Sequence, residues 1–416
     1  MRHVIIGNGI AGTQAAESIR HLDGNCSITM ISDEEWPPYS RPMITLVMEG
    51  SLKPEDILVR DPDFYQRLGI EPVLGSRATS IDTRNRHVII DEGEIGSTKH
   101  TLPFDRLLIA TGADPRPVKA QGLELENIFF LRNLAQVSRM NQVIRPGRKA
   151  LVLGGGLVGF KAATALLKRG LEVTMLITSA HPLSMQLDPL AGQLVLKELL
   201  AYGLDVRVGK EVTAFEGPAG LQKAHLADGS SLDCDLAVIG KGVLPALDFV
   251  PRQDIAVDLG IRVDDHLETS CPGIFAAGDV AEHLDLARQT PWVNAIWPEA
   301  VNQGRLAGMN MAGRPVRSQG SLGRNMIRIF DLDIMTCGLI NPPEEEYEIL
   351  NHWDPRRSTY RKLVFRQDRL VGAVMVNDIE QSGLLVSLIQ NQRPVDLPKA
   401  KLLSPGLNWK QLISAH

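Results

Sequence analysis

The feature that most constrains this 416-residue chain is a glycine-rich turn near its N-terminus. The apolar run of residues 4–6 predicts a buried strand, and Ala15, Ala16 and Ile19 open a helical period. Three glycines join them with Gly-x-Gly-x-x-Gly spacing: Gly7, Gly9 and Gly12. The first permits a tight turn, the second lets a pyrophosphate approach the backbone, and the third lets helix and strand pack closely. The turn predicts dinucleotide binding, with phosphates at the positive end of the helix.

Two acidic residues follow at the distance expected for a ribose ligand. Residues 27–32 predict the next strand, which ends at Asp33 and Glu34, about twenty residues after the turn. One of these carboxylates is placed to bind ribose hydroxyls. A glycine turn with a purely structural role is the alternative.

A second turn of the same kind lies in the middle of the chain. Residues 150–153 predict a strand, and the apolar residues of 162–167 predict the next helix. The glycines between them repeat the spacing: Gly154, Gly156 and Gly159. Two such turns, each between a strand and a helix, predict two dinucleotides that must meet.

Other segments complete the expected organisation. Residues 35–60 contain prolines and predict a loop, residues 73–102 predict an antiparallel insert, and residues 382–390 predict a short helix in a C-terminal α+β segment. Further strands are expected to end at glycine-containing sequences, namely Ala110–Gly112, Gly240–Gly242 and Gly278–Asp279. Asp279 would either hydrogen-bond a polyol chain or cap the next helix. Pro298 suits the first turn of a helix.

Composition narrows the class of protein. The net charge of −5 argues against nucleic acid as a partner, and no apolar run reaches the roughly 20 residues that span a bilayer. The N-terminus enters a strand at once, so we expect no signal peptide and a cytoplasmic location. The four cysteines form no Cys-x-x-Cys pair, so we expect neither a zinc site nor a redox motif, and no iron–sulfur ligand pattern is present.

With these motifs assembled, the chain resembles the pyridine nucleotide–disulfide reductases that bind two dinucleotides. It is most similar to branches without a redox disulfide: rubredoxin and ferredoxin reductases and the flavin module of assimilatory nitrite reductases. The motifs are the two glycine turns, Tyr39–Pro42, Ala110–Gly112, Gly278–Asp279 and Trp297–Gly304. The resemblance implies an α/β fold with two Rossmann-like three-layer ββα dinucleotide-binding domains and a C-terminal α+β interface domain.

The resemblance also implies cofactors and their ligands. FAD would be bound by residues 1–112 with 246–318, NAD(P) by 113–245, and residues 319–416 would form the interface or docking domain. Asp279 would bind the flavin ribityl chain, and the helix near Pro298 would point its positive end at the flavin. The implied FAD ligands are Gly7, Gly9, Ile10, Ala11, Gly12, Asp33, Glu34, Arg41, Pro42, Ala110, Thr111, Gly112, Gly278, Asp279 and Trp297. The implied NAD(P) ligands are Gly154, Gly156, Leu157, Val158, Gly159 and Gly242.

Departures from the family pattern are informative. Residues 41–48, where disulfide reductases carry reactive cysteines, contain none, so thiol–disulfide chemistry is not expected. Related ferredoxin reductases have a lysine where this chain has Leu46 and a glutamate where it has Lys161. Lys161 is our candidate for a cation near flavin N5, with a solvated helix lysine as the alternative. The strand ending at Ile177 is followed by neither acid nor arginine, which favours NADH over NADPH; His181 is a phosphate ligand or an ordinary loop histidine.

These features lead to three hypotheses. The first is an FAD-dependent NAD(P)H:acceptor oxidoreductase that exchanges electrons with a ferredoxin- or rubredoxin-like iron–sulfur carrier, acting alone or as the NAD-linked flavin subunit of a complex. The second is a stand-alone NADH oxidase, and the third is a non-catalytic FAD-binding interaction subunit. A homodimer and a hetero-oligomer are both compatible. Residues 314–416 hold 14 Arg and Lys against 11 Asp and Glu, so Arg356, Arg357, Arg361 and Lys362 are either a docking surface or a solvated charged face.

Overall fold

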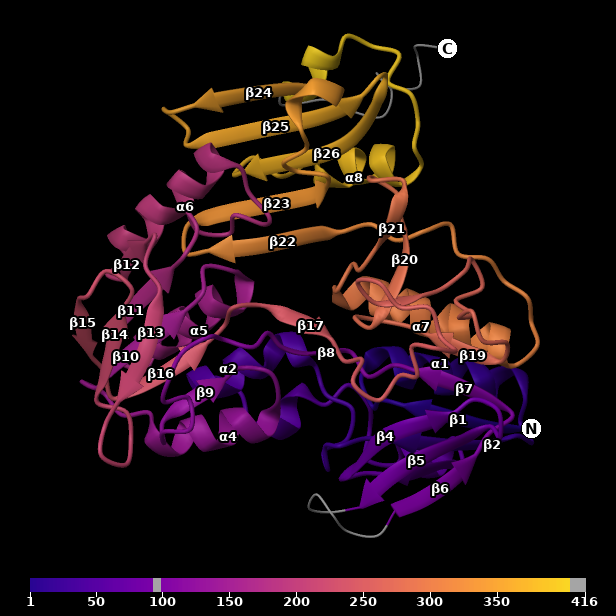
Figure 1. The fold of residues 1–416 in the computed structure, drawn as a ribbon. Coiled ribbons are helices and arrows are strands. Elements are labelled where there is room, and N and C mark those ends of the chain that lie inside the picture. The colour runs from indigo at the N-terminus through magenta and orange to yellow at the C-terminus, as the bar shows by residue number, and fades with distance from the viewer. Residues whose placement is uncertain (93–98, 405–416) are drawn as a thin grey trace. The chain divides into compact units, whose positions relative to one another are not determined.

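A computed structural model describes residues 1–92 and 99–404, and the chain divides into two compact units (Figure 1). The first unit consists of Met1–Pro42, Glu55–Asp114 and Leu244–Gly323. The second consists of Met43–Pro54, Pro115–Val243 and the residues from Arg324 onward. The assignment of separate FAD, NAD(P) and interface domains by residue number stays a prediction.

The first unit is built on a five-stranded parallel sheet with the order β19-β7-β1-β2-β3. Helices α1 (Ile10–Leu22) and α7 (Trp297–Met311) pack against one another. The two helices can approach closely because α7 has glycine at the contact positions 304 and 308. A Cβ on Gly304 would lie only 2.2 Å from the Ala11 carbonyl oxygen, and a Cβ on Gly308 only 2.5 Å from the Ala15 carbonyl oxygen. The strands are β1 (Arg2–Ile6), β2 (Ser27–Ile31), β3 (Ile70–Val73), β7 (Arg106–Ile109) and β19 (Ile274–Ala276).

Two small sheets complete the first unit. The predicted antiparallel insert is confirmed, with order β4-β5-β6. A second sheet has the order β18-β20-β21, and α3 (Phe64–Arg67) precedes β3. The strands are β4 (Ser76–Asp82), β5 (His87–Glu92), β6 (Lys99–Pro103), β18 (Ile261–Arg262), β20 (Ala281–Asp285) and β21 (Thr290–Trp292). Where the chain passes between units, β8 (Ala113–Pro115) pairs with β17 (Val243–Pro245).

The second unit repeats the parallel design with the order β12-β11-β10-β16-β9. An antiparallel sheet, β13-β14-β15, follows β12. The strands are β9 (Ile128–Phe130), β10 (Lys149–Leu153), β11 (Glu172–Ile177), β12 (Asp205–Val208), β13 (Val212–Glu216), β14 (Lys223–Leu226), β15 (Ser231–Asp233) and β16 (Leu236–Ile239). The helices are α4 (Leu134–Val143), α5 (Leu157–Lys168) and α6 (Pro189–Ala201).

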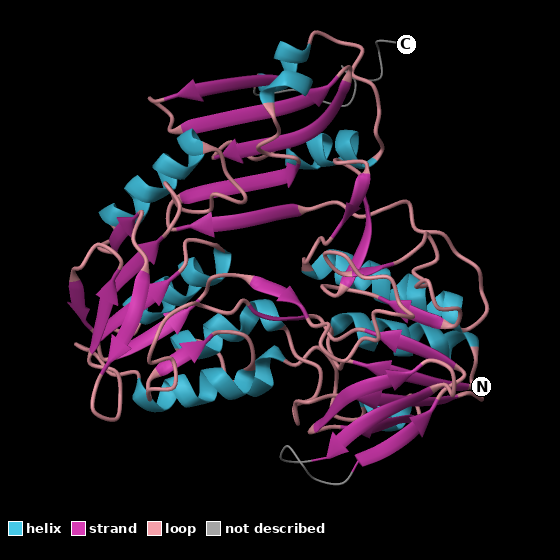
Figure 2. Cartoon of the chain, viewed as in Figure 1, coloured by secondary structure: helices cyan, strands magenta, loops and turns pink. Residues whose placement is uncertain are grey.

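The C-terminal part of the second unit is one antiparallel sheet with the order β22-β23-β26-β25-β24 (Figure 2). Helix α8 (Ser382–Gln390) packs on it and has the predicted bounds. The strands are β22 (Arg324–Ile329), β23 (Leu332–Gly338), β24 (Glu348–Asp354), β25 (Thr359–Arg366) and β26 (Arg369–Val376). The predicted fold class is therefore confirmed: two parallel α/β sheets and a C-terminal α+β part.

A buried polar cluster ties α6 to this C-terminal sheet. The Asp188 carboxylate caps α6, accepting from the Ala191 amide at 3.1 Å, and accepts from the Tyr360 hydroxyl at 2.5 Å. The Lys362 ammonium lies 3.4 Å from the same carboxylate and donates to the Asn341 side chain at 3.3 Å. Asp188 and Lys362 are both buried. Because each charge is compensated inside the fold, the cluster fixes α6 against the sheet.

The segment predicted as a loop contains a helix, so that prediction is wrong in part. Helix α2 (Ile44–Glu49) follows a 3₁₀ turn at Arg41–Met43 and ends at Gly50, whose φ is 87°. Three prolines of this segment precede Ile44 and Pro54 follows Gly50, so none of them interrupts the hydrogen bonds of the helix. In the described parts of the chain, no helix is long and apolar enough to cross a bilayer.

Candidate dinucleotide-binding sites

The first glycine turn has the geometry that its three glycines require. Gly7 has φ 119°, and a Cβ there would lie 2.1 Å from the Ala110 carbonyl oxygen, at the end of β7. A Cβ on Gly12 would lie 2.0 Å from the Gly7 oxygen. No side chain could be added at either position without moving backbone. Both glycines are therefore explained by close packing around the strand-to-helix turn.

The second turn reproduces the first in detail. Gly154 also has φ 119°, and its Cβ would lie 2.4 Å from the Gly240 oxygen, at the end of β16. A Cβ on Gly159 would lie 2.0 Å from the Gly154 oxygen, the same distance as in the first turn. The two units thus present equivalent turns at equivalent places in their sheets.

The middle glycine of each turn differs from its neighbours. Gly9 and Gly156 are the N-caps of α1 and α5, with φ of −78° and −83° and ψ of −177° in both. A Cβ on either glycine would meet no atom within 4 Å. Neither helix has a side-chain cap or an acidic residue in its first turn. An open approach to an uncompensated helix N-terminus fits a phosphate group, so both turns suit a dinucleotide.

A residue that sequence reasoning missed holds the first turn in place. The Asn8 side chain donates to the Trp36 carbonyl at 3.1 Å and accepts from the Tyr65 hydroxyl at 2.9 Å. Burial raises the pKa of Tyr65 to about 12, so its hydroxyl stays a donor. Asn8 occupies a variable position of the motif, and the sequence carries no signal that sets it apart.

The two acids after β2 differ in their surroundings. Glu34 accepts from the Tyr39 hydroxyl at 2.5 Å and forms an ion pair with Arg41. Asp33 is exposed. The side chains of the Tyr39–Arg41 motif thus converge on Glu34, and Asp33 lies open to solvent at the end of the strand. Pro42 follows Arg41 in the 3₁₀ turn.

The remaining predicted FAD ligands lie at strand ends of the same unit. Ala110 donates its amide to the Ile6 carbonyl at 2.7 Å, and the Thr111 hydroxyl donates to the Ala246 carbonyl at 3.2 Å. Gly278, with φ 82°, donates its amide to the buried Gln303 side chain at 2.8 Å. Gly112 also has positive φ, 72°, Asp279 follows Gly278, and Trp297 begins α7. These residues share one unit with the first glycine turn.

The predicted nicotinamide-nucleotide ligands lie in the second unit. Leu157 and Val158 begin α5, and Gly242 follows β16 with φ 90°. His181 is buried, with its Nδ1 2.9 Å from the Pro182 carbonyl oxygen. Its ring lies against Gly192 of α6, where a Cβ would come within 2.0 Å of Nδ1. The histidine therefore has a packing role. This favours the interpretation of His181 as an ordinary structural residue and not as a phosphate ligand.

Helix α2 lies against α4 and α5 in the second unit. Arg169 donates to the Met48 carbonyl at 3.0 Å, and Lys168 pairs with Glu49 at 3.0 Å. Lys161 is on α5, in the second turn, and burial lowers the pKa of its ammonium. None of these segments contains a cysteine.

The four cysteines of the chain are free thiols. Burial raises the pKa of Cys234 to about 12 and also raises the pKa of Cys271. Both are consequently protonated at neutral pH and poor nucleophiles. The four thiols thus form no disulfide with one another, as the sequence predicted.

The structure contradicts the prediction that Arg356, Arg357, Arg361 and Lys362 form one exposed docking surface or charged face. Arg361 and Lys362 are both buried, whereas Arg356 and Arg357 are exposed. Successive residues of a strand point to opposite faces, and both faces are covered here. Arg361 donates to the Gln381 side chain at 3.0 Å and to the Leu402 carbonyl at 2.9 Å, while Lys362 faces the cluster at Asp188 described above.

Comparison with known proteins agrees with this geometry. Residues 1–304 match the family described as pyridine nucleotide-disulphide oxidoreductase, and residues 324–393 match the rubredoxin NAD+ reductase C-terminal domain. The chain is 31% identical to the NADH-dependent phenylglyoxylate dehydrogenase subunit epsilon of Aromatoleum evansii, covering 93% of this chain and 91% of that protein.

One further relative and one solved structure are informative. The chain is 29% identical to the assimilatory nitrate reductase electron transfer subunit of Bacillus subtilis over 97% of its own length, and it spans about half of that relative, 51%. Its fold matches putidaredoxin reductase in a covalent complex with putidaredoxin, with a TM-score of 0.89, 24% identity and coverage of 100% and 98% of the two chains. The chain belongs to the pyridine nucleotide-disulphide oxidoreductase family.

Proposed function

We propose that this chain is an FAD-dependent NADH:acceptor oxidoreductase that exchanges electrons with a separate iron–sulfur protein. The observation that carries the proposal is the pair of equivalent glycine turns, each with an open approach at Gly9 or Gly156. Because no reactive thiol is available to carry electrons, two dinucleotide sites imply direct hydride transfer from one bound nucleotide to the other. Bound FAD would supply a flavin that accepts a hydride and releases electrons singly.

The first turn would hold FAD and the second the exchanging nicotinamide nucleotide. Backbone amides after Gly9 would bind the pyrophosphate, and Asp33 or Glu34 the ribose. Asp279 would bind the ribityl chain, and the N-terminus of α7 would favour negative charge on the flavin. The absence of arginine in residues 178–181 supports NADH over NADPH.

The iron–sulfur partner is proposed from the names of relatives. One is a subunit of an NADH-dependent dehydrogenase, another an electron transfer subunit, and a structural neighbour is bound to putidaredoxin. The C-terminal part matches a rubredoxin NAD+ reductase domain. We propose that the chain works as the NAD-linked subunit of a complex of this kind, and we expect it to act in the cytoplasm.

Anaerobic titration of the purified chain tests the function. NADH is expected to bleach the flavin absorbance at about one equivalent, with NADPH far less effective, and an added ferredoxin-type protein is expected to restore the colour. Restoration by oxygen alone, with no transfer to any iron–sulfur protein, would favour the oxidase. Failure of both nucleotides to bleach a bound flavin would favour the non-catalytic subunit.

The role of Lys161 has its own expected outcome. If its ammonium lies near the flavin or the nicotinamide, Lys161→Met should slow stopped-flow flavin reduction by NADH at least about tenfold, or lower the flavin potential. Lys168→Met is the matched control, because Lys168 lies on the same helix with its side chain 59% exposed. An unchanged rate together with an unchanged potential in Lys161→Met would refute the role.

A further inference from the structure

A buried imidazole without a hydrogen-bond partner lies in the first unit. His3, in β1, is 1% exposed, and neither Nδ1 nor Nε2 has a hydrogen-bond partner among the described residues. A buried polar group without a hydrogen bond is destabilising, so two on one ring call for an explanation such as an ion. Burial lowers the pKa of His3 to about 4, which leaves the ring neutral at pH 7.

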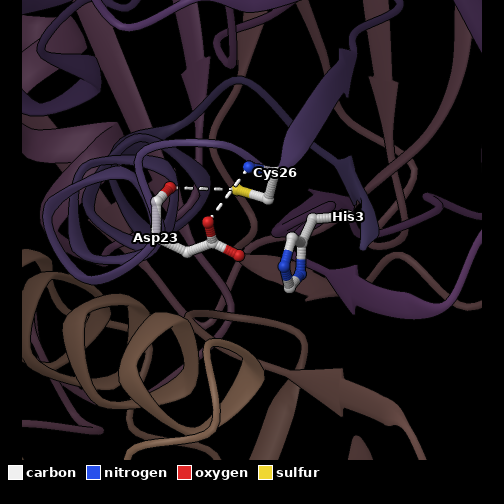
Figure 3. Close-up of side chains that lie close together, drawn as sticks. All are labelled: His3, Asp23 and Cys26. Atoms are coloured by element: carbon white, nitrogen blue, oxygen red, sulfur yellow. Dashed lines mark hydrogen bonds between the residues drawn. The ribbon is translucent and has the colours of Figure 1, made fainter.

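Two further donor groups face this ring. Asp23 is the C-cap of α1, and Cys26 directly precedes β2. One ligand atom from each of His3, Asp23 and Cys26 lies within 4.8 Å of the others (Figure 3). Figure 3 shows the Asp23 carboxylate between the thiol and the imidazole. Imidazole, carboxylate and thiolate are together a donor set typical of zinc.

The turn that carries these groups is held in place by its own hydrogen bonds. Asp23 Oδ1 accepts from the Asn25 amide at 2.9 Å and from the Cys26 amide at 3.1 Å, leaving Oδ2 for a ligand. Arg20 donates to five backbone carbonyls, at residues 23, 24, 26, 68 and 69. The site is consequently preorganised by groups that are not themselves ligands.

Two of the three donor groups would be anionic in a metal complex. A thiolate and a carboxylate would neutralise a divalent cation, and the imidazole adds no charge. Burial raises the pKa of Cys26, and the Arg20 guanidinium, 3.6 Å from Sγ, acts in the opposite direction. Coordination to a metal would itself deprotonate the thiol. After burial, the N-terminal ammonium and Arg106 also lower the pKa of His3, whereas Asp23 and Asp105 act in the opposite direction.

We propose that His3, Asp23 and Cys26 bind one divalent transition-metal ion, zinc by preference, with water as the fourth ligand. Zinc bonds of about 2.0–2.3 Å place tetrahedral ligand atoms roughly 3.5 Å apart, so the side chains need to close by only about 1 Å. Binding replaces the Cys26 S–H bond with a sulfur–zinc bond and releases the proton to solvent. The thiol's hydrogen bond to the Asp23 backbone carbonyl, at 3.3 Å, is given up in this step. The ion would join β1 to the connection between α1 and β2, independently of the proposed redox function.

The test uses the full-length FAD-loaded protein, purified without a histidine tag or chelator. After incubation with zinc and gel filtration, we expect one zinc per chain by elemental analysis. Cys26→Ser and Asp23→Asn should both lose it. His266→Gln is the matched control, because Asp264, Asp265 and His266 form the other cluster with metal-ligand geometry in the described residues, an exposed one. Zinc should be retained in that variant.

Cobalt supplies a second readout. Its visible bands at wavelengths beyond the flavin absorption should appear in the wild type and be absent from Cys26→Ser. Zinc should raise the melting temperature of the wild type but not of Asp23→Asn, in which FAD content verifies folding. Substoichiometric zinc in the wild type, or zinc retained in both ligand variants, would overturn the proposal and leave water as the partner of His3.

Discussion

Replacing Gly9 by valine is expected to give a folded protein that does not retain FAD, whereas Gly156→Val should retain FAD and fail to bind NADH. Both glycines have extended backbone, and an added Cβ meets nothing in the fold. The valine side chains would instead occupy the space proposed for a pyrophosphate. We expect each to weaken its own nucleotide at least about 100-fold, or about 2.7 kcal/mol. Flavin content and NADH titration measure the two effects separately.

Two controls make this comparison decisive. Gly24→Val places a side chain at another position where a Cβ meets nothing within 4 Å, and it should change neither nucleotide. Gly12→Ala should instead impair folding, since its Cβ would lie 2.0 Å from a backbone oxygen. If both valine variants kept both nucleotides, the assignment of the turns would be wrong.

Asp188→Ala is expected to have the largest effect on stability. The substitution leaves the buried Lys362 ammonium without its carboxylate and removes the acceptor of the Tyr360 hydroxyl. Breaking a buried ion pair on one side costs about 3–5 kcal/mol. Urea unfolding followed by far-ultraviolet circular dichroism should show this loss in the second unit.

A double variant separates the unpaired charge from general damage. Adding Lys362→Met to Asp188→Ala removes the uncompensated ammonium and should recover much of the lost stability. Asp331→Ala is the control: its carboxylate accepts from Tyr202 at an exposed position, so the change should stay within about 0.5 kcal/mol. A loss below about 1 kcal/mol in Asp188→Ala would mean that the cluster has little energetic role.

Those parts of the fold that depend on residues close together in the sequence could be predicted. The spacing of Gly7, Gly9 and Gly12 encodes a turn whose backbone leaves no room for side chains at two of the three positions. The same holds for the second turn, so the fold class and the positions of the two turns could be inferred from the sequence. Helix 382–390 was also predictable from its apolar period.

What could not be predicted depends on contacts between distant segments. In the sequence, Arg361 and Lys362 look like a solvated charged pair. In the structure, Arg361 donates to the buried Leu402 carbonyl, and Lys362 lies beside the buried Asp188 carboxylate, which is far away in sequence. Helix α2 is short and obtains its stabilising contacts from α4 and α5, so its own residues do not reveal it. Asn8 and His3 likewise acquire their surroundings only through tertiary structure.

The discontinuity of the first unit has a consequence for synthesis on the ribosome. Its sheet is completed by β19 and its helix α1 is covered by α7, so the elements that begin the chain wait for partners almost three hundred residues later. The parallel sheet of the second unit, β9 to β16, emerges whole before that point. Because domains form as their sequences become available, the nascent chain should fold its middle first, with the apolar face of α1 exposed meanwhile. Folding intermediates and their chaperones should be sought at that stage, when an uncovered helix invites aggregation.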